Sequence, residues 1–154
     1  MSVIDLTALK SALQPRQCLL GLDLGSKTIG LAVSDPGFII ASPIDTIRRT
    51  KFTKDIGLLK EVITRRNIGG LVLGLPVSMD GSEGPRCQST RQFATNVLNQ
   101  MEIPIALWDE RLSTSAIQRI LIDEADMTRR RRAEVVDKMA AAYILQGALD
   151  MMSQ

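Results

Sequence analysis

Histidine is absent from the 154 residues of this sequence, and there are only two cysteines, Cys18 and Cys87. The lack of histidine excludes every mechanism that needs an imidazole as base, nucleophile or metal ligand. Two cysteines are too few for a four-thiolate zinc site or for a framework of disulfides. A reduced, cytoplasmic protein is therefore the simplest interpretation of the cysteine content.

Long apolar runs are also missing. No run reaches the roughly 18 residues that a membrane-spanning helix needs. Residues 1–15 carry Asp5 and Lys10 and lack the basic-then-apolar order of a signal peptide. We expect no membrane partner and one domain, residues 18–154, after an N-terminal extension, residues 1–17, because a domain usually has roughly 100–200 residues.

Charge is nearly balanced but unevenly distributed. The 19 basic and 17 acidic side chains give a formal net charge of +2. Four of the basic side chains are consecutive, at Arg129, Arg130, Arg131 and Arg132, and the rest of the chain is mildly acidic. This arginine run is a candidate phosphate-binding segment, and a solvated loop is the alternative interpretation.

Apolar periodicity and turn signals predict the order β-β-β-α-β-α-β-α-α. A short helix at residues 6–13 precedes three strands at 18–24, 29–34 and 38–47, which short turns should join into an antiparallel meander. Pro43 places the third strand near an edge or a bulge. Strands are then expected at 71–75 and 103–108, and helices at 53–67, 85–101, from 115 onward and at about 133–150. Gly69 and Gly70 should end the helix at 53–67.

This order predicts an α/β protein with a mixed five-stranded sheet, three antiparallel strands followed by two parallel ones. Right-handed crossovers place helices on both faces of such a sheet. It is the element order of the ribonuclease-H-like fold, although several unrelated α/β folds begin in the same way.

Asp23 is the first candidate site residue. In the segment Gly-Leu-Asp-Leu-Gly, residues 21–25, a strand points the leucines to one face and Asp23 to the other, between two glycines. The space beside the carboxylate admits a metal ion, a phosphate or a close backbone. A solvated aspartate at the end of a strand is the alternative. Lys27, in the turn that follows, is a second candidate for phosphate contact.

Asp109 and Glu110 form the second candidate site, at the C-terminal end of the fifth predicted strand. Ligands of open α/β sheets gather at this end. The two side chains point to opposite faces if the strand continues, so at most one shares the face of Asp23. Ordinary polar residues before a helix are the alternative.

Asp137 is the third candidate. It shares one stripe of the last predicted helix with Ala141, Ile144 and Ala148, so its carboxylate faces the body of the protein. A buried carboxylate needs a cation, a metal ion or a shifted pKa. Stabilisation of a helix N-terminus by an acidic residue is the alternative.

Together these residues offer three carboxylates and neither histidine nor a thiolate pair. Oxygen ligands favour Mg²⁺ or Mn²⁺. Two such ions about 3.5–4 Å apart can activate a water molecule and stabilise the leaving oxygen of a phosphodiester. The arginine run beside Asp137 would supply phosphate contacts.

Residues 20–35, LGLDLGSKTIGLAVSD, resemble the N-terminal signature of the YqgF family of Holliday junction resolvases and pre-16S ribosomal RNA nucleases. The similarity continues, in order and at the expected spacing, in residues 43–47, 73–76, 79–84, 109–114 and 136–146. The resemblance implies a ribonuclease-H-like fold and a metal-dependent nuclease. It also implies that the acidic site residues, catalytic and metal-ligating, are Asp23, Glu110 and Asp137.

One departure from related enzymes is visible. The better-characterised resolvases of this fold carry an acidic residue at the end of the fourth strand, where this sequence has Gly74-Leu75-Pro76. The second carboxylate must then come from Glu110. Asp80 and Glu83 are candidates to join the site, and the number of metal ions stays open.

The resemblance favours hydrolysis of phosphodiester bonds at the 5′ end of precursor 16S ribosomal RNA, with branched DNA as the alternative substrate. Phosphate contacts carry no sequence information, so the residues do not separate the two. For substrate binding we expect Lys27, Arg111 and the arginine run. Ribosomal precursor particles are expected partners, and the protein is expected to be a monomer or a homodimer.

Parts of the sequence are also compatible with two other classes of function. A non-catalytic ribosome-assembly factor would bind RNA through the arginine run alone and would tolerate the loss of Asp23. The residues Asp23, Gly25, Lys27 and Gly30 also resemble the first phosphate loop of sugar kinases and actin-like ATPases. Those proteins need two such domains, for which 154 residues leave no room.

Overall fold

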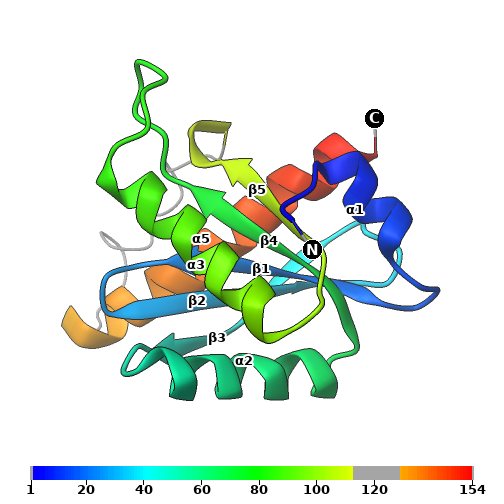
Figure 1. The fold of residues 1–154 in the computed structure, drawn as a ribbon, viewed down its shortest axis with the longest axis horizontal. Helices are drawn as coiled ribbons and strands as arrows, with labels where there is room; N and C mark the ends of the chain where they lie inside the picture. The colour runs from blue at the N-terminus through cyan, green and yellow to red at the C-terminus, as the bar shows by residue number, and fades with distance from the viewer. Residues whose placement is uncertain (1, 113–128, 154) are drawn as a thin grey trace.

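The computed structural model describes residues 2–112 and 129–153, and within 129–136 it describes the backbone alone. Five strands form one sheet in the order β3-β2-β1-β4-β5 (Figure 1). They are β1 Cys18–Leu24, β2 Thr28–Ser34, β3 Ala41–Arg48, β4 Ile68–Leu75 and β5 Ile105–Asp109. The pairs β1–β2 and β2–β3 are antiparallel, whereas β1–β4 and β4–β5 are parallel. The predicted mixed sheet is confirmed.

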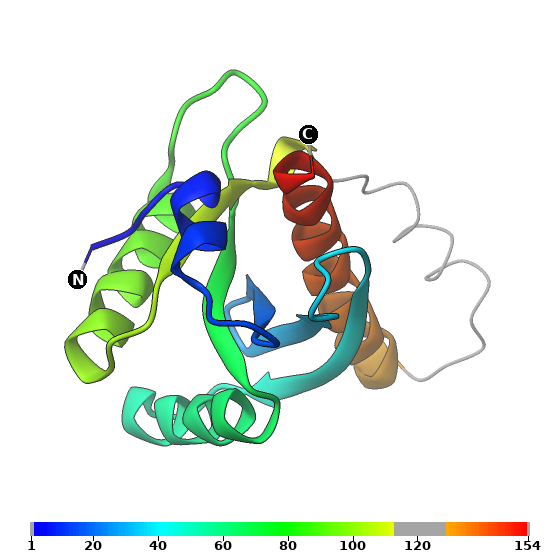
Figure 2. The ribbon, with the colours of Figure 1, turned by 90° about the vertical axis from the view of Figure 1, so that its right-hand side faces the viewer.

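Helices cover both faces of this sheet. They are α1 Leu6–Ala12, α2 Phe52–Arg65, α3 Pro85–Gln100 and α5 Arg129–Met152, with a short 3-10 helix, η1 Glu110–Leu112. Figure 2 shows α2 and α3 on one side of the sheet and α5 on the other. The helix predicted from Ser115 onward lies outside the described residues.

Two apolar layers result from the alternation of side chains along β1. Leu20 and Leu22 are fully buried in the layer beneath α2 and α3. Leu19 lies in the other layer, against Ala141 and Leu145 of α5. The face of β1 that carries Asp23 is therefore the face on which α5 packs.

Several predicted boundaries were wrong. Gly69 and Gly70 lie within β4 and do not end α2; the helix stops before Asn67, whose φ of +53° no helix can contain. The third strand starts at Ala41 because the Asp35 carboxylate accepts hydrogen bonds from the backbone N–H groups of Ile39 and Ile40. These bonds close a longer turn than was predicted.

Pro43 does lie on an edge strand, as predicted, and the β2–β3 register shifts between Leu31 and Ala32, opposite this proline. Proline has no N–H group to donate to a neighbouring strand, so an edge accommodates it.

The predicted start of the last helix was also too late. α5 begins at Arg129, so the arginine run forms its first turn and does not precede it as a loop. Arginine is a good helix former, and nothing in the run prevents the helix from extending through it. The backbone of the run is thus continuous with the segment that carries Asp137.

The segment before β1 packs against the sheet. The carboxylate of Asp5 caps α1 by accepting a hydrogen bond from the N–H group of Ala8, and Leu9 is fully buried. The N–H group of Ile4 donates to the carbonyl of Ile105. Within the described residues, no helix is long and apolar enough to cross a membrane.

Candidate active site

Two of the three predicted acidic residues meet at one edge of the sheet. Asp23 lies near the C-terminal end of β1, and Glu110 directly follows β5. The parallel strands β1, β4 and β5 all end at this edge, which explains why residues so far apart in the sequence are neighbours. The side chain of Glu110 forms a hydrogen bond with that of Asp23.

This contact gives the pair a shared proton. Burial raises the pKa of Asp23 to about 7, with further contributions from the negative charges of Glu110 and Asp137. Burial also raises the pKa of Glu110, although the charge of Arg86 and the hydrogen bond from Asp23 oppose this. Because this bond raises the pKa of Asp23 and lowers that of Glu110, we assign the proton to Asp23, which then donates to the Glu110 carboxylate. Near neutral pH the pair therefore exchanges a proton with solvent.

A glycine on β4 makes room for Glu110. A Cβ atom at Gly74 would lie 2.5 Å from Oε1 of Glu110 and 2.5 Å from Cδ1 of Ile144. The carboxylate of Glu110 thus fills the space above the end of β4. The second carboxylate comes from η1, and the missing side chain on β4 admits it.

Asp137 approaches the pair from α5. A Cβ atom at Gly30 would collide with the backbone carbonyl of Asp137, so the absence of a side chain on β2 sets how closely α5 approaches. Gly30 is the register partner of Asp23. The hydroxyl of Thr28, also on β2, donates a hydrogen bond to the carboxylate of Asp137. As predicted, the stripe that continues from Asp137 through Ala141, Ile144 and Ala148 is buried.

Arg86 brings positive charge to this site. It lies in the first turn of α3, and its guanidinium donates to the carbonyl of Leu24 at 3.4 Å. Its charge lowers the pKa of both Asp23 and Glu110 and so opposes the rise that burial causes. An arginine beside buried carboxylates is suited to bind a phosphate.

The neighbouring acidic residues are engaged elsewhere. Asp109 pairs with Arg111, with 2.6 Å between the guanidinium and the carboxylate, and this pairing lowers the pKa of Asp109. Glu83 binds Arg91 at 2.7 Å. Asp80 accepts hydrogen bonds from the N–H group and the hydroxyl of Ser82.

The predicted substrate-binding residues are placed as follows. Arg111 forms a salt bridge with Asp109, which neutralises its charge. Lys27 is exposed in the turn between β1 and β2. The arginine run begins α5, two turns before Asp137. The sequence pattern did not identify Thr28 as a member of the site or Arg86 as a neighbour of the acidic pair. Thr28 lies in the predicted turn after the strand that carries Asp23, and Arg86 lies at the start of the predicted helix at 85–101. These positions are the features of the sequence that could have indicated their place in the site.

The donor set suits a hard divalent cation, because all three side chains are carboxylates. As the side chains stand, the described residues hold no group of three acidic, cysteine or histidine side chains positioned around one ion. The hydrogen bonds explain this: Asp23 and Glu110 bond to each other, and Asp137 bonds to Thr28. Loss of the shared proton and a turn of the Asp137 carboxylate would free these oxygens for a cation.

Solved structures of two resolvases share this fold. A Thermus thermophilus RuvC structure in complex with a Holliday junction substrate has a TM-score of 0.52 at 13% identity, over 89% of this chain and 96% of the other. The yeast mitochondrial Holliday junction resolvase Ydc2 has a TM-score of 0.51 at 13% identity, over 94% and 82%. At this identity the likeness concerns the fold, and it confirms the ribonuclease-H-like architecture.

Sequence relatives cover the whole chain. A protein of Paramagnetospirillum magneticum is 63% identical over 99% of this chain and 98% of its own length. A protein of Rhodospirillum rubrum is 58% identical over 100% and 96%. Both carry the name "Putative pre-16S rRNA nuclease". The family described as "RuvX: Holliday junction resolvase" matches residues 17–151. The chain belongs to this RuvX family, the YqgF family that its sequence resembles, and it is a nuclease, a hydrolase that acts on ester bonds.

Proposed function

We propose that this nuclease needs a divalent metal ion, Mg²⁺ or Mn²⁺, and that it processes the 5′ end of precursor 16S ribosomal RNA. The observation that carries the proposal is the contact of Asp23 with Glu110. Asp137 lies near enough to this pair for its negative charge to raise the pKa of Asp23. Carboxylates gathered in one buried place repel one another. A cation that binds among them would relieve this repulsion.

Asp23, Glu110 and Asp137 would hold the metal, which would polarise a phosphoryl oxygen and lower the pKa of a bound water molecule. The protein's own groups prepare this site. The Asp23–Glu110 pair keeps one proton until a cation competes for it, because metal ligands must be deprotonated. Thr28 orients Asp137, and Arg86 attracts the phosphate to the edge of the sheet.

The substrate is held by positive charge around this edge. Lys27 is exposed next to the site, and the arginine run starts the same helix that carries Asp137. Arg111 contributes less than predicted, because Asp109 neutralises it. The names of the curated relatives support precursor ribosomal RNA as the substrate. In this proposal the protein acts in the cytoplasm on ribosomal precursor particles; its state as monomer or homodimer stays a prediction.

The test is cleavage of precursor 16S RNA and of a four-way DNA junction, measured side by side with Mg²⁺, with Mn²⁺ and with a chelator. Asp23→Asn and Glu110→Gln should abolish metal-dependent cleavage of the RNA. Asp109→Asn is the matched control, because Asp109 is the adjacent carboxylate and is bound to Arg111. It should retain most of the activity.

Each outcome has a distinct meaning. Cleavage of the junction and not of the RNA would favour branched DNA, the substrate named for the family and present in the Thermus thermophilus RuvC complex. Cleavage that persists in the chelator would refute metal dependence. Ribosomal RNA maturation that is unaffected in cells carrying Asp23→Asn would favour the non-catalytic assembly factor.

A further inference from the structure

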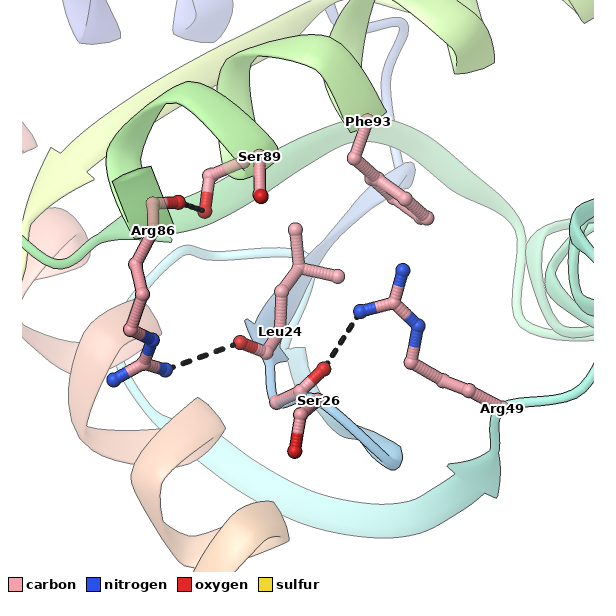
Figure 3. A pocket seen from close by; sticks show the side chains of 8 residues that line it. Leu24, Ser26, Arg49, Arg86, Ser89 and Phe93 are labelled. Carbon is pink, nitrogen blue, oxygen red and sulfur yellow. Dashed lines mark hydrogen bonds between the residues drawn. The ribbon is translucent and has the colours of Figure 1, made fainter. Parts of the chain in front are cut away.

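A pocket of about 210 Å³ lies beside the acidic pair and is not used by the chemistry described above. It opens at the C-terminal end of β1, between the β1–β2 turn and α3 (Figure 3). Its lining consists of Leu24, Gly25, Ser26, Arg49, Arg86, Ser89, Thr90 and Phe93. The volume is several times the roughly 30 Å³ that one water molecule occupies. It therefore has room for a group larger than a single ion.

Arg49 is fixed in the wall of this pocket. Its guanidinium donates to the carbonyl of Gly25 at 2.6 Å and lies 5.8 Å from the ring centre of Phe93. That ring is supported edge-on by Phe52, at 5.9 Å between the ring centres. Among the described residues, no carboxylate forms a salt bridge with Arg49. A part-buried cation with carbonyl and aromatic neighbours favours an anionic ligand.

Arg86 joins the pocket to the active site. It lines the pocket and bonds to Leu24, while its charge also acts on Asp23 and Glu110. Figure 3 shows Arg86 and Arg49 on opposite sides of the pocket, each with a hydrogen bond to the chain at the end of β1. Besides Gly25, the remaining lining is of two kinds: the hydroxyl-bearing side chains of Ser26, Ser89 and Thr90, and the apolar side chains of Leu24 and Phe93. Guanidinium and hydroxyl groups suit a phosphate, whereas the apolar wall suits a sugar or a base.

The position of the pocket limits the form of the nucleic acid. Asp23 and Leu24 are consecutive residues of a strand and point to opposite faces of the sheet. The acidic pair therefore lies on the α5 side of the sheet edge and the pocket on the α3 side. A strand with its scissile phosphate at the acidic pair must bend over this edge to place its next nucleotide in the pocket. A nucleotide that is paired in a duplex is not free to do so.

We infer that the pocket binds one unpaired nucleotide of the substrate strand, adjacent to the phosphodiester that is cut. The inference rests on the proposed function for the place of the cut, but the binding of an unpaired nucleotide is testable without cleavage. The phosphate lies between Arg86 and the hydroxyl groups, and the base contacts Phe93 and Arg49. The enzyme therefore prefers a single-stranded segment next to its cleavage position.

The test measures binding in the full-length Asp23→Asn protein, which should bind without cutting. Ser89→Trp fills the pocket from an exposed position on α3, and Asn99→Trp is the control at an exposed position of the same helix outside the pocket. Fluorescence anisotropy gives the Kd for a short single-stranded RNA and for a blunt duplex. Stacking contributes about 1–3 kcal/mol per base, so Ser89→Trp should weaken single-strand binding by about five-fold or more. Duplex binding and the Asn99→Trp control should stay close to the parent.

A second measurement does not depend on the folding of that variant. Titration of the parent protein with uridine monophosphate should shift the amide NMR signals of Ser89 and Phe93, and inorganic phosphate should shift them less. Arg49→Met removes the guanidinium that contacts the base, so it should weaken single-strand binding and leave duplex binding close to the parent. Unchanged single-strand affinity in a folded Ser89→Trp protein, or no shift with the mononucleotide, would overturn the inference.

Failure of the proposed function gives a different result. If the wild-type protein cuts neither substrate but Ser89→Trp still weakens single-strand binding, the proposed function is wrong and the nucleotide site stands. If the wild-type protein cuts the RNA, and Ser89→Trp binds and cuts it equally well, the nucleotide site is wrong and the proposed function stands.

Discussion

The carboxylate of Glu110 occupies the space above Gly74: a Cβ atom there would lie 2.5 Å from Oε1 of Glu110. This relationship links the loop after β5 to the end of β4 and brings Glu110 to Asp23. It also explains how the site has its second carboxylate without an acidic residue on β4.

Gly74→Ala should therefore impair cleavage more than folding. The added methyl group displaces Glu110 and the end of the Ile144 side chain, both of which are flexible, so the cost in stability should be about 1–3 kcal/mol. Activity should fall by about 100-fold or more, because a misplaced catalytic group can cost that factor. Thermal unfolding and cleavage rates, measured on the same preparation, check this. Near wild-type cleavage by Gly74→Ala would show that the position of Glu110 is not required.

Asp23→Asn should stabilise the metal-free protein in a pH-dependent way. The folded pKa of Asp23, about 7, exceeds the ordinary value of 3.8, so between these values the folded state binds more protons than the unfolded state. Wild-type stability should then fall as pH rises from about 4 to 7, and the loss should be complete above that range. Asparagine removes the effect, so the variant should gain roughly 1–4 kcal/mol at pH 8 and little at pH 4. Denaturant unfolding of both proteins in chelator at pH 4 and pH 8 measures this difference in the free energy of unfolding. An equal difference at the two pH values would contradict the prediction.

Thr28→Val should loosen the orientation of Asp137. Valine keeps the shape of the side chain but cannot donate the hydrogen bond that Asp137 accepts. We expect a stability loss of about 1 kcal/mol and a fall in cleavage of about ten-fold. Thr28→Ser restores the hydroxyl group and should recover most of the activity. Cleavage rates of the wild type, Thr28→Val and Thr28→Ser are measured over a series of Mn²⁺ concentrations. If Thr28 orients Asp137, only Thr28→Val should show a weaker apparent affinity for the metal.

Gly30→Ala should move α5 away from β2. The added Cβ atom collides with the backbone at Asp137, which cannot rotate away as a side chain end does. Overpacking of this kind costs about 1–3 kcal/mol, or more where backbone must shift. Gly57→Ala is the matched control: nothing lies within 4 Å of its added Cβ atom, and it lies within α2. That control should gain about 0.5–1 kcal/mol. Similar melting temperatures for the two variants would contradict the close approach of α5.

Replacement of Arg129, Arg130, Arg131 and Arg132 by glutamine should weaken binding of RNA and DNA alike. Each lost phosphate contact should flatten the log–log salt slope by about 0.7 for single strands and about 0.9 for duplex DNA. Turnover should change less than affinity. The control replaces Lys60, Arg65 and Arg66, which are exposed at the end of α2, near the start of β4 and far from the active-site edge. Equal salt slopes in both variants would exclude the arginine run from substrate binding.

The sequence by itself determined the order of the strands and of the described helices that follow them, the mixed sheet, and the candidate acids Asp23 and Asp137. These follow from local regularities: alternation along a strand and the periodicity of a helix report which face of an element is buried. The choice of Glu110 over Asp109 came from the family resemblance, because strand alternation leaves both open.

Only the tertiary structure decided the partners of these groups. Thr28 and Asp137 are 109 residues apart, and nothing in either neighbourhood predicts their hydrogen bond. Three further features depend on how the ends of β4 and β5, η1 and the start of α3 meet at one edge: the neutralisation of Arg111 by Asp109, the space above Gly74 and the pocket between Arg49 and Arg86. Local pattern fixes which way a side chain faces, but the packing of distant elements fixes what that side chain meets, and this contact sets its charge and its chemistry.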